Sequence, residues 1–348
     1  MFSRLSRPCA LFCLSVALVA AGARPAAAAA SFDEVKRAFR PSDTRVLDRD
    51  GELLQRVRTD ATVRRGQWVA LADVSPALRT AMLLSEDKRF YEHSGVDWRA
   101  VSAAAWGNLW NTKTRGASTI TMQLAGLLDD DLRRGAGGRS LTQKVGQTLD
   151  AQQFERRWRK DQILEAYLNT VPFRGEIVGI DALSRTLFGK APSGLDAREA
   201  ALAAALVRAP NAKPAQVAQR ACEVLRTMES ERTVAASKTD CEAMDMFASA
   251  ALQRRAFDPS EGIAPHLGRR AVKEATSGLA VDSVRTTLRA PLQRFALATL
   301  QQHLRELRGR HVEDGALVVL DNATGEVLAW VGSSGPLSQA AEVDGVLA

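Results

Sequence analysis

Two adjacent acids in a short motif could carry out general-base chemistry. Glu86 and Asp87 begin the string EDKRFYEHSGVDW, in which Lys88, Phe90 and His93 follow. Aromatic residues, a histidine and a glycine turn after the acids favour a carboxylate at the lip of a cleft, where it can accept a proton. An ordinary charged helix terminus contains the same residue types, and composition alone favours that simpler interpretation.

A second motif, GASTITMQ, combines hydroxyl groups and an amide at the predicted start of a helix. Ser118, Thr119 and Gln123 are its polar residues. The N–H groups of a helix N-terminus favour an anion such as phosphate, so the motif predicts an anion-binding position. Helix capping alone also explains Ser118.

Positive charge follows a charged, glycine-rich stretch over 129–140, which we expect to be a loop. Arg139 lies near its end, and Lys144 and Gln147 come shortly after it. Cations at such a position can form charge-assisted hydrogen bonds with a phosphate or carboxylate.

Helices with recognisable ends must position these motifs. Ser75, as the cap, and Pro76 predict the start of a helix that leads to Glu86. Asp196 and Glu199 predict a capping box before a helix that ends ahead of proline. Further helices are predicted from Asp97 with an apolar stripe to Leu109, from the cap Ser118 through Leu127, and across 141–170.

The flanking regions contain the predicted strands. Residues 44–58 alternate apolar and polar side chains around Asp50-Gly51, which predicts a short β-hairpin. Residues 316–320 and 326–331 predict a second hairpin, which is too small to stand alone and must dock elsewhere or belong to a larger domain. Residues 211–285 are less patterned and predict a connector, and leucines over 297–307 mark one further helix.

Composition bounds the class of protein. The 348 residues suggest two domains, and 46% hydrophobic with 25% charged residues supports a packed core. Only 5% of residues are aromatic while alanine is abundant, which favours helices. The net charge of +7 is too small and dispersed for a nucleic-acid-binding protein, and basic and aromatic residues are not interleaved.

The N-terminus predicts export. Arg4 and Arg7 precede an apolar run over 8–23, as in a signal peptide or a membrane anchor, and both alternatives stay open. In an oxidising compartment Cys222 and Cys241 could form a disulfide, or they could be two separate buried thiols.

The order and wording of the motifs resemble those of the family-51 peptidoglycan glycosyltransferases, the lipid II polymerase domain of class A penicillin-binding proteins. The matching strings are SEDKRFYEHSGVDW, RGASTITMQ and KDQILEAYLN, followed by GIDAL and FGK. The resemblance covers about 44–210, and DRDGELL, APH and Gln147 point to the 1C branch. TTLRAPLQ and GALVVLDNATGEVLAWVGS are similar to the opening of a transpeptidase domain.

This resemblance implies a mainly α fold: a lysozyme-like helical glycosyltransferase domain with a small β-hairpin region before it and a connector and an incomplete α/β transpeptidase-like segment after it. We therefore expect five segments: 1–30 (signal peptide or anchor), 31–70 (hairpin and linker), 71–212 (glycosyltransferase), 213–285 (connector) and 286–348 (truncated transpeptidase-like domain).

The resemblance also implies roles for single residues. Glu86 matches the base that removes a proton from the 4-hydroxyl of the acceptor sugar, whose oxygen then displaces undecaprenyl diphosphate from the donor with inversion. Asp87 matches a supporting acid, and Arg139 and Lys144 match cations that hold the diphosphate. The remaining substrate-binding residues implied are Lys88, Phe90, His93, Ser118, Thr119, Gln123 and Gln147. A divalent metal, Mg or Mn, could share the charge of the leaving group.

Departures from the family pattern keep other functions open. Gln147 replaces the usual second glutamate, in the string QKVGQ over 143–147, and Gly126 replaces a cation. The alternatives are therefore a catalytically weakened scaffold that binds lipid II or glycan, and a lysozyme-like enzyme that cleaves glycan. The sequence contains no Lys-Thr-Gly motif, so transpeptidase activity is not expected of this chain.

The expected partners are lipid II, the nascent glycan strand, other cell-wall synthesis proteins and a membrane surface, without nucleic acid. The expected location is the periplasmic side of the inner membrane. Six large apolar residues could supply an interfacial surface, although ordinary core packing explains each one: Trp106, Leu109, Trp110, Leu124, Leu127 and Leu128.

Overall fold

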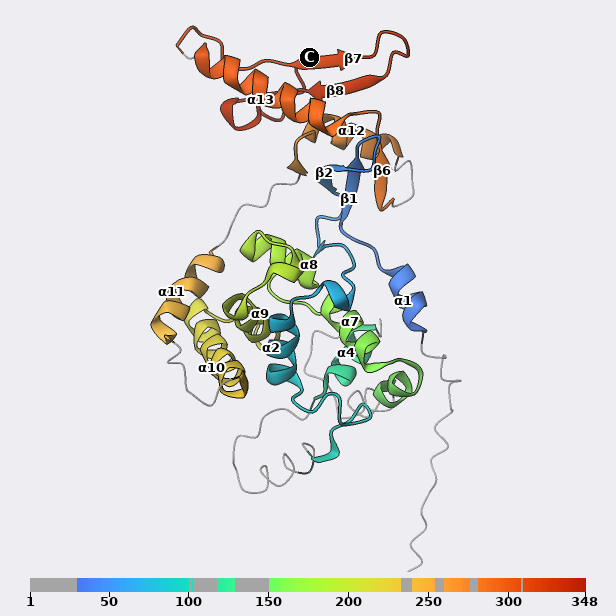
Figure 1. Ribbon diagram of the computed structural model, residues 1–348, viewed down its shortest axis with the longest axis vertical. Helices are drawn as coiled ribbons and strands as arrows, with labels where there is room; N and C mark the ends of the chain where they lie inside the picture. Colours follow the sequence, from blue (N-terminus) through green and yellow to red (C-terminus); the bar gives the residue numbers. More distant parts are fainter. Residues whose placement is uncertain are drawn as a thin grey trace, which may run out of the picture.

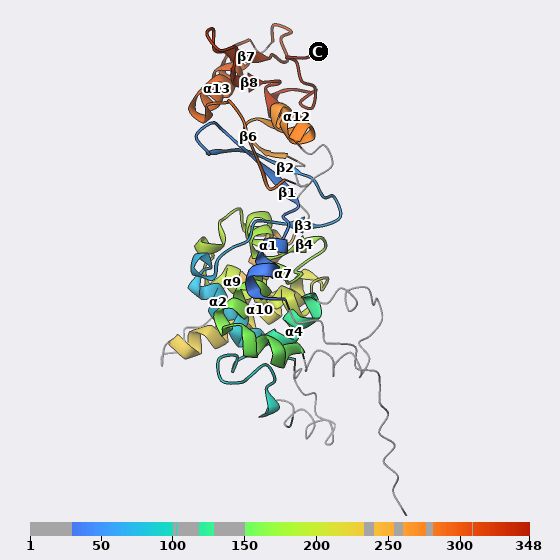
Figure 2. The ribbon, with the colours of Figure 1, turned by 90° about the vertical axis from the view of Figure 1, so that its right-hand side faces the viewer.

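The computed structural model contains two bodies, one above the other in Figures 1 and 2: a larger helical body and a smaller body built around a sheet. The structure describes residues 30–99, 102, 118–128, 150–232, 240–253, 260–275, 281–307 and 309–348. The predicted N-terminal segment (except Ala30), most of the helix predicted from Asp97, the loop over 129–140 and residues 141–149 lie outside these ranges.

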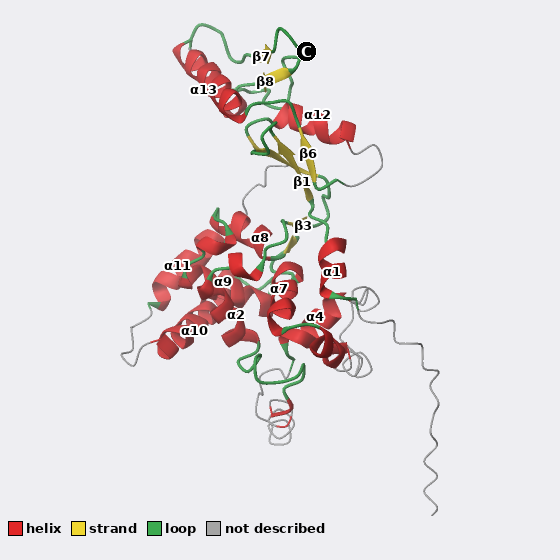
Figure 3. Ribbon diagram, turned by 45° about the vertical axis from the view of Figure 1, so that its right-hand side comes forward, coloured by secondary structure: helices red, strands yellow, loops and turns green. Residues whose placement is uncertain are grey.

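Helices dominate the larger body, as the colouring by secondary structure in Figure 3 makes plain. Its elements, in chain order, are α1 (Phe32–Ala38), β3 (Arg64–Arg65), η1 (Leu71–Asp73), α2 (Pro76–Glu86), α4 (Ile120–Leu128), helical residues 150–157, α7 (Lys160–Thr170), β4 (Ile177–Val178), α8 (Ile180–Leu183), η2 (Ser184–Phe188), η3 (Pro192–Gly194), α9 (Ala197–Arg208), α10 (Pro214–Arg232) and α11 (Cys241–Ala251). One hydrophobic core joins α2, α4, α7, α9, α10 and α11, and the mainly α fold is confirmed.

Helix α2 confirms the predicted helix that leads to Glu86. Leu78, Ala81 and Met82 are buried at helical spacing, and the helix packs against α9. The predicted cap is wrong in one detail. Ser75 makes no capping hydrogen bond, because its hydroxyl donates to the carbonyl of Leu195 at 2.6 Å, and Pro76 alone marks the first turn.

Helix α9 begins with the predicted capping box. The side chain of Asp196 accepts hydrogen bonds from the amides of Arg198 and Glu199, and the side chain of Glu199 accepts from the amide of Asp196. The helix ends at Arg208, ahead of Pro210, as the sequence predicts.

The start of α4 corrects a second cap. The hydroxyl of Thr119, not of Ser118, accepts a hydrogen bond from the amide of Met122 at 3.2 Å. This is the spacing between an N-cap and the third helical residue, so the helix begins one residue later than Ser118 predicted.

Residues 213–285, which we expect to be a less patterned connector, contain regular helices. Residues 214–232 form α10, a 19-residue helix that packs on α9 and α2, and α11 packs on α10. The apolar residues Val217, Ala221, Leu225 and Met228 recur at helical spacing and are buried. The alternative left open for the cysteines is decided, because Cys222 and Cys241 form a disulfide with a Cα–Cα distance of 5.6 Å.

The smaller body is built on a four-stranded sheet in the order β5-β2-β1-β6. The predicted hairpin is confirmed as β1 (Asp43–Leu47) antiparallel to β2 (Leu53–Arg58). Two three-residue strands from far along the chain complete the sheet, since β5 (Ser260–Gly262) joins β2 and β6 (Ser283–Arg285) runs parallel to β1. Helix α12 (Pro265–Ala275) covers the sheet.

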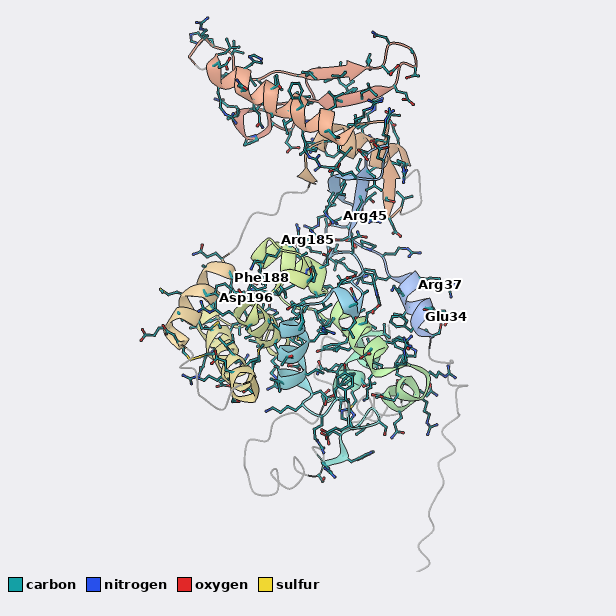
Figure 4. The ribbon with its side chains drawn as sticks, viewed as in Figure 1. Glu34, Arg37, Arg45, Arg185, Phe188 and Asp196 are labelled. Carbon is teal, nitrogen blue, oxygen red and sulfur yellow. A yellow bond between two sulfur atoms is a disulfide. The ribbon has the colours of Figure 1, made fainter. Side chains whose placement is uncertain are left out.

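The C-terminal hairpin docks on a helix, as its small size requires. Strands β7 (Leu317–Leu320) and β8 (Val327–Val331) pair antiparallel, and η4 (Gly335–Leu337) follows them. Ala296 of α13 (Ala290–Glu306) is buried against Ala329 and Val331 of the hairpin. Figure 4 places Arg45 of β1 at the junction between the two bodies and Arg185 at the end of the helical body nearest to it.

Within the described residues, no helix is long and apolar enough to cross a membrane. The expected domain boundaries stay predictions.

Candidate active site

A polar cavity of about 460 Å³ lies where four segments of the helical body meet. The end of α2 and the loop after it, the residues just before α4, the end of α9 and one face of α10 form its walls. Its lining residues are Leu84, Ser85, Glu86, Asp87, Lys88, Arg89, Asp97, Ser118, Thr119, Ala205, Arg208, Arg220, Glu223, Val224 and Thr227.

Glu86 is the last residue of α2 and lines this cavity with three side-chain hydrogen-bond donors around its carboxylate. One oxygen, Oε1, accepts from the hydroxyl of Ser85 at 2.9 Å and from Nε of Arg208 at 3.1 Å. The other, Oε2, accepts from the amide nitrogen of Gln123 at 3.2 Å. The side chain of Glu86 is only 7% exposed, so these polar partners replace most of the water around it.

Tyr167 of α7 extends this network away from the cavity. Its hydroxyl donates to Oε1 of Gln123 at 2.9 Å, which leaves the amide nitrogen of Gln123 to face Glu86. Complete burial raises the pKa of Tyr167 well above its usual value, and the negative charges of Glu86 and Asp87 raise it further. Tyr167 therefore stays a protonated donor over the physiological pH range.

Asp87 points away from its neighbour and binds other groups. Its Oδ2 accepts a hydrogen bond from the amide of Ile120 at 3.1 Å, and both of its oxygens lie within 3.0 Å of Nε2 of His93. The amide at the start of α4, where the sequence predicts an anion such as phosphate, donates here to the protein's own carboxylate. Asp87 thereby fixes the second motif beside the first.

The loop that follows α2 needs a glycine at position 95. Gly95 has φ +88°, and a Cβ there would lie 2.8 Å from the carbonyl oxygen of Ala151. Its own carbonyl accepts a hydrogen bond from the hydroxyl of Thr119 at 2.6 Å, so the loop and the start of α4 are joined a second time.

The remaining charged side chains of the cavity differ in their partners. Arg89 forms an ion pair with Asp97, and Lys88 is exposed at the rim. Nη1 of Arg220 is buried and finds no hydrogen-bond partner in the part of the chain that the structure describes. A buried guanidinium nitrogen without a partner is costly, which favours an anionic ligand at this wall of the cavity.

The structure brings together part of the predicted site. Glu86, Asp87, Lys88, Ser118 and Thr119 all line the cavity, and Gln123 contacts its carboxylate. The predicted residues Arg139, Lys144 and Gln147 lie outside the described residues, as do Trp106, Leu109 and Trp110.

Two of the residues predicted to contact substrate do not line the cavity. Phe90 is buried in the hydrophobic core, where Nζ of Lys160 lies 4.4 Å from its ring centroid. Nε2 of His93 pairs with the carboxylate of Asp87. The side chain of His93 is 8% exposed and does not line the cavity. Both residues shape the loop after α2.

The apolar residues of α4 support ordinary packing. Leu124 is fully buried, and Leu127 and Leu128 are partly buried against the same core. Packing in the core, the simpler of the two interpretations, thus accounts for these three of the six residues named for a membrane surface.

The third motif, KDQILEAYLN, serves mainly to hold the fold. Asn169 is buried and exchanges hydrogen bonds with the backbone of Val69, and Glu165 accepts from the amide of Leu71 and the indole of Trp68. Among the contacts described above, Tyr167 is the one residue of this motif that belongs to the hydrogen-bond network around Glu86.

Sequence reasoning missed Arg208, Tyr167 and the whole wall that α10 provides. The helical spacing of apolar residues over 217–228 was an available signal for α10. Arg208 offered no local signal, because its contact with Glu86 spans 122 residues.

The described residues do not fit a divalent metal. They contain no group of three or more histidine, cysteine or acidic side chains that could hold one. Glu86 is surrounded by donors, and Asp87 by His93 and an amide, so neither carboxylate is arranged as a metal ligand here. No catalytic step is therefore assigned to a metal.

A helical body with a carboxylate held by hydrogen bonds in a polar cavity is the architecture of an enzyme that uses acid–base chemistry. Residues 50–229, more than half of the chain, match the family model described as Transglycosylase. The chain belongs to this transglycosylase family.

Three relatives show how far the similarity extends. Penicillin-binding protein 2D from Bacillus subtilis (strain 168) is 30% identical over 285 residues, which are 76% of this chain and 39% of that protein. Penicillin-binding protein 1C from Escherichia coli (strain K12) is 33% identical over 275 residues, 77% of this chain and 34% of that protein. The biosynthetic peptidoglycan transglycosylase of Rhodospirillum centenum (strain ATCC 51521 / SW) is 39% identical over 172 residues, 47% of this chain and 70% of that protein. The chain thus spans less than two fifths of the length of the two penicillin-binding proteins.

Proposed function

We propose that this protein is a peptidoglycan glycosyltransferase that polymerises lipid II into glycan strands. The observation that carries the proposal is Glu86, a hydrogen-bonded carboxylate in a polar cavity of a transglycosylase-family chain. The relatives named for peptidoglycan transglycosylase and penicillin-binding proteins support the choice of peptidoglycan as product.

The chemistry follows from the position of Glu86. Its carboxylate accepts the proton of the 4-hydroxyl of the acceptor sugar while that oxygen bonds to the anomeric carbon of the donor. The bond from that carbon to the diphosphate breaks, and the electron pair leaves with undecaprenyl diphosphate, which inverts the configuration.

The leaving group needs positive surroundings, because negative charge accumulates on it. Among the described residues that line the cavity, Arg220 is a cation with a buried nitrogen that has no hydrogen-bond partner, which supports a role in binding such an anion. The family resemblance assigns the same task to Arg139 and Lys144. Two or three cations around one diphosphate would stabilise its departure without a metal.

Cleavage of glycan is the second candidate, and one observation favours it. Glu223 of α10 lines the same cavity as Glu86, and most glycoside hydrolases use a pair of carboxylates. A scaffold that binds lipid II or glycan without turnover is the third candidate.

One assay separates these functions. Purified protein is incubated in detergent or vesicles with labelled lipid II and, separately, with preformed uncrosslinked glycan. Polymer formed from lipid II supports the proposal, shortening of preformed glycan supports cleavage, and saturable binding without either product supports a scaffold. Glu223→Gln should leave polymerisation nearly unchanged, and a variant that loses only glycan cleavage would assign Glu223 to the second candidate.

The proposal also covers location and partners. A polyprenyl substrate supports a working position at a membrane surface, and the export signal predicted at the N-terminus supports the periplasmic side of the inner membrane. Lipid II, the growing glycan strand and other wall-synthesis proteins are its proposed partners. The similarity of residues 286–348 to the opening of a transpeptidase domain stays a proposal of the same kind.

A further inference from the structure

Two side chains that have no site role in the sequence analysis are linked to the two carboxylate oxygens of Glu86, Tyr167 through Gln123 and Arg208 directly. We propose that Tyr167 and Arg208 are positioning residues that orient Glu86 for proton transfer, Tyr167 through Gln123 and Arg208 by direct contact. This inference rests on the proposed function, because it names how the base of that reaction is oriented.

The first side of the clamp runs from α7 through α4 to α2. The hydroxyl of Tyr167 donates to Oε1 of Gln123 at 2.9 Å, and Nε2 of Gln123 donates to Oε2 of Glu86 at 3.2 Å. If the amide of Gln123 were turned over, its oxygen would face the carboxylate, and two acceptors would repel each other. Tyr167 prevents this turn, since it presents a donor to the oxygen.

Tyr167 is suited to this task because it cannot move. It is fully buried on α7, among the largest buried side chains of the helical core. Its burial and the neighbouring negative charges keep the hydroxyl protonated, as the raised pKa of Tyr167 indicates. Because the hydroxyl of Tyr167 is a fixed donor, it fixes the orientation of the Gln123 amide that lies between Tyr167 and Glu86.

The second side of the clamp comes from the end of α9. Nε of Arg208 donates to Oε1 of Glu86 at 3.1 Å, and Nη2 donates to the carbonyl oxygen of Ser85. The guanidinium thus joins the carboxylate to the C-terminal end of the helix that carries it. Two donors in one planar group can do this, whereas a lysine has a single charged nitrogen.

The two sides differ in exposure, which suggests how the base is reached. The side chain of Arg208 is 41% exposed and that of Glu86 is 7% exposed, so Arg208 lies between the carboxylate and solvent. Gln123 and Tyr167 lie on the protein side. An acceptor hydroxyl can therefore approach Oε1 beside Arg208 while Gln123 keeps Oε2 in place.

Orientation of this kind has a measurable effect on rate. A misplacement of about 1 Å at a reacting group can reduce turnover by roughly 100-fold. Loss of an arm of the clamp should reduce kcat and leave KM nearly unchanged, because neither arm is needed to bind the sugar or the lipid.

The test compares two clamp variants with two matched controls in the full chain. Tyr167→Phe removes one hydroxyl and keeps the ring, and Arg208→Gln removes the charge at a half-exposed position. Tyr91 is the only other tyrosine in the sequence, and Tyr91→Phe removes its bond to Asp161. Arg198 lies exposed on the same helix as Arg208, and Arg198→Gln is the control for charge.

Steady-state polymerisation of lipid II gives kcat and KM, and thermal unfolding of each preparation gives its folded fraction. We expect kcat to fall by about 10- to 100-fold in both clamp variants, with KM within about twofold, and Arg208→Lys to recover part of the rate. The controls should match the wild type.

Several outcomes would overturn the inference. If both clamp variants turn over as fast as the wild type, the contacts are incidental. If KM rises while kcat is unchanged, the residues bind substrate and do not position the base. Should Tyr167→Phe fail to fold, Arg208→Gln and Arg208→Lys still decide the question. A wild-type protein that forms no polymer at all would instead contradict the proposed function.

Discussion

The helical body and the sheet body each bury a carboxylate, and the two carboxylates have opposite kinds of partners. Asp48, in the turn between β1 and β2, is 1% exposed and accepts from the backbone amides of Asp50 at 2.9 Å, Glu52 at 2.8 Å and Ala290 at 3.1 Å. Among the described residues, the partners of the Glu86 carboxylate are the side chains of Ser85, Gln123 and Arg208, and Glu86 lines a cavity.

The kind of hydrogen-bond donor distinguishes Asp48, an acid that stabilises the fold, from Glu86, an acid that can take part in a reaction. Backbone amides are fixed by the turn and by the start of α13, so Asp48 joins two segments and has no access to a ligand. A substrate hydroxyl can replace one of the side-chain donors as the hydrogen-bond partner of the carboxylate, so Glu86 remains able to react. Burial alone therefore does not identify a functional acid; the kind of donor and the access to a cavity do.

We expect the largest effect on activity from substitution of Glu86, the acid that can take part in the reaction. Glu86→Gln keeps the size of the side chain but cannot accept a proton, so polymerisation of lipid II should fall by about 10²- to 10⁴-fold. Its thermal unfolding should match the wild type. A variant that polymerises at a near-normal rate would refute the role of Glu86 as the base.

The helical body should lose stability when its disulfide is removed. A cross-link over a separation of 19 residues contributes about 3 kcal/mol, so the double variant Cys222→Ala with Cys241→Ala should unfold at lower denaturant. Hydrogen exchange should increase in α10 and α11 and stay unchanged over 43–58. Counting thiols under denaturing, non-reducing conditions checks the bond itself, and free thiols at both Cys222 and Cys241 would contradict it.

The structural acid should affect stability and leave activity unchanged. Asp48→Asn places an NH₂ group against at least one backbone N–H, which costs about 1–3 kcal/mol in the free energy of unfolding. Denaturant unfolding with exchange over 43–58 measures the loss, and lipid II turnover at low temperature serves as the control. If Asp48→Asn lost turnover but kept its stability, the distinction between the structural role of Asp48 and the reactive role of Glu86 would be wrong.

Asp48 also predicts that the sheet body loses stability at low pH. Burial acts to raise the pKa of Asp48, but the hydrogen bonds from Ala290, Glu52 and Asp50 outweigh it and lower the pKa below its usual value. A lowered pKa in the folded state gives stability that is present above about pH 4 and is lost as the pH falls through the folded value. The wild type should therefore lose stability below pH 4 more steeply than Asp48→Asn.

The smallest expected effect concerns the neutral residue at position 147. Gln147→Glu restores the charge usual in the family, so the rate of polymerisation should equal or exceed that of the wild type, most clearly with added Mg²⁺ or Mn²⁺. Initial rates with and without the metal test this. A large loss would show that the amide of Gln147 has a role of its own.

Local signals explain what the sequence could predict of the fold. The capping box at Asp196 and Glu199, the proline at the start of α2 and the turn at Asp50-Gly51 each act over a few residues, and all three elements formed. Strands β5 and β6 have three residues each, too few for a periodic pattern, and they exist because the first hairpin offers them its edges.

The site was predictable only where a motif marked it. Glu86, Ser118, Thr119 and Gln123 lie in such motifs and do gather around one cavity. Arg208 meets Glu86 because α9 packs against α2, and the direction in which a helix ends depends on the whole core. No pattern of neighbouring residues contains that information.

The most direct test of the central claim is a structure of the wild-type protein with a lipid II analogue that has an intact 4-hydroxyl in the acceptor position and cannot react as a donor. The measured quantity is the distance from that hydroxyl oxygen to the carboxylate of Glu86. We predict a hydrogen bond of about 2.6–3.2 Å. A sugar bound elsewhere, or its 4-hydroxyl bonded to another side chain while Glu86 keeps all of its present partners, would contradict the account.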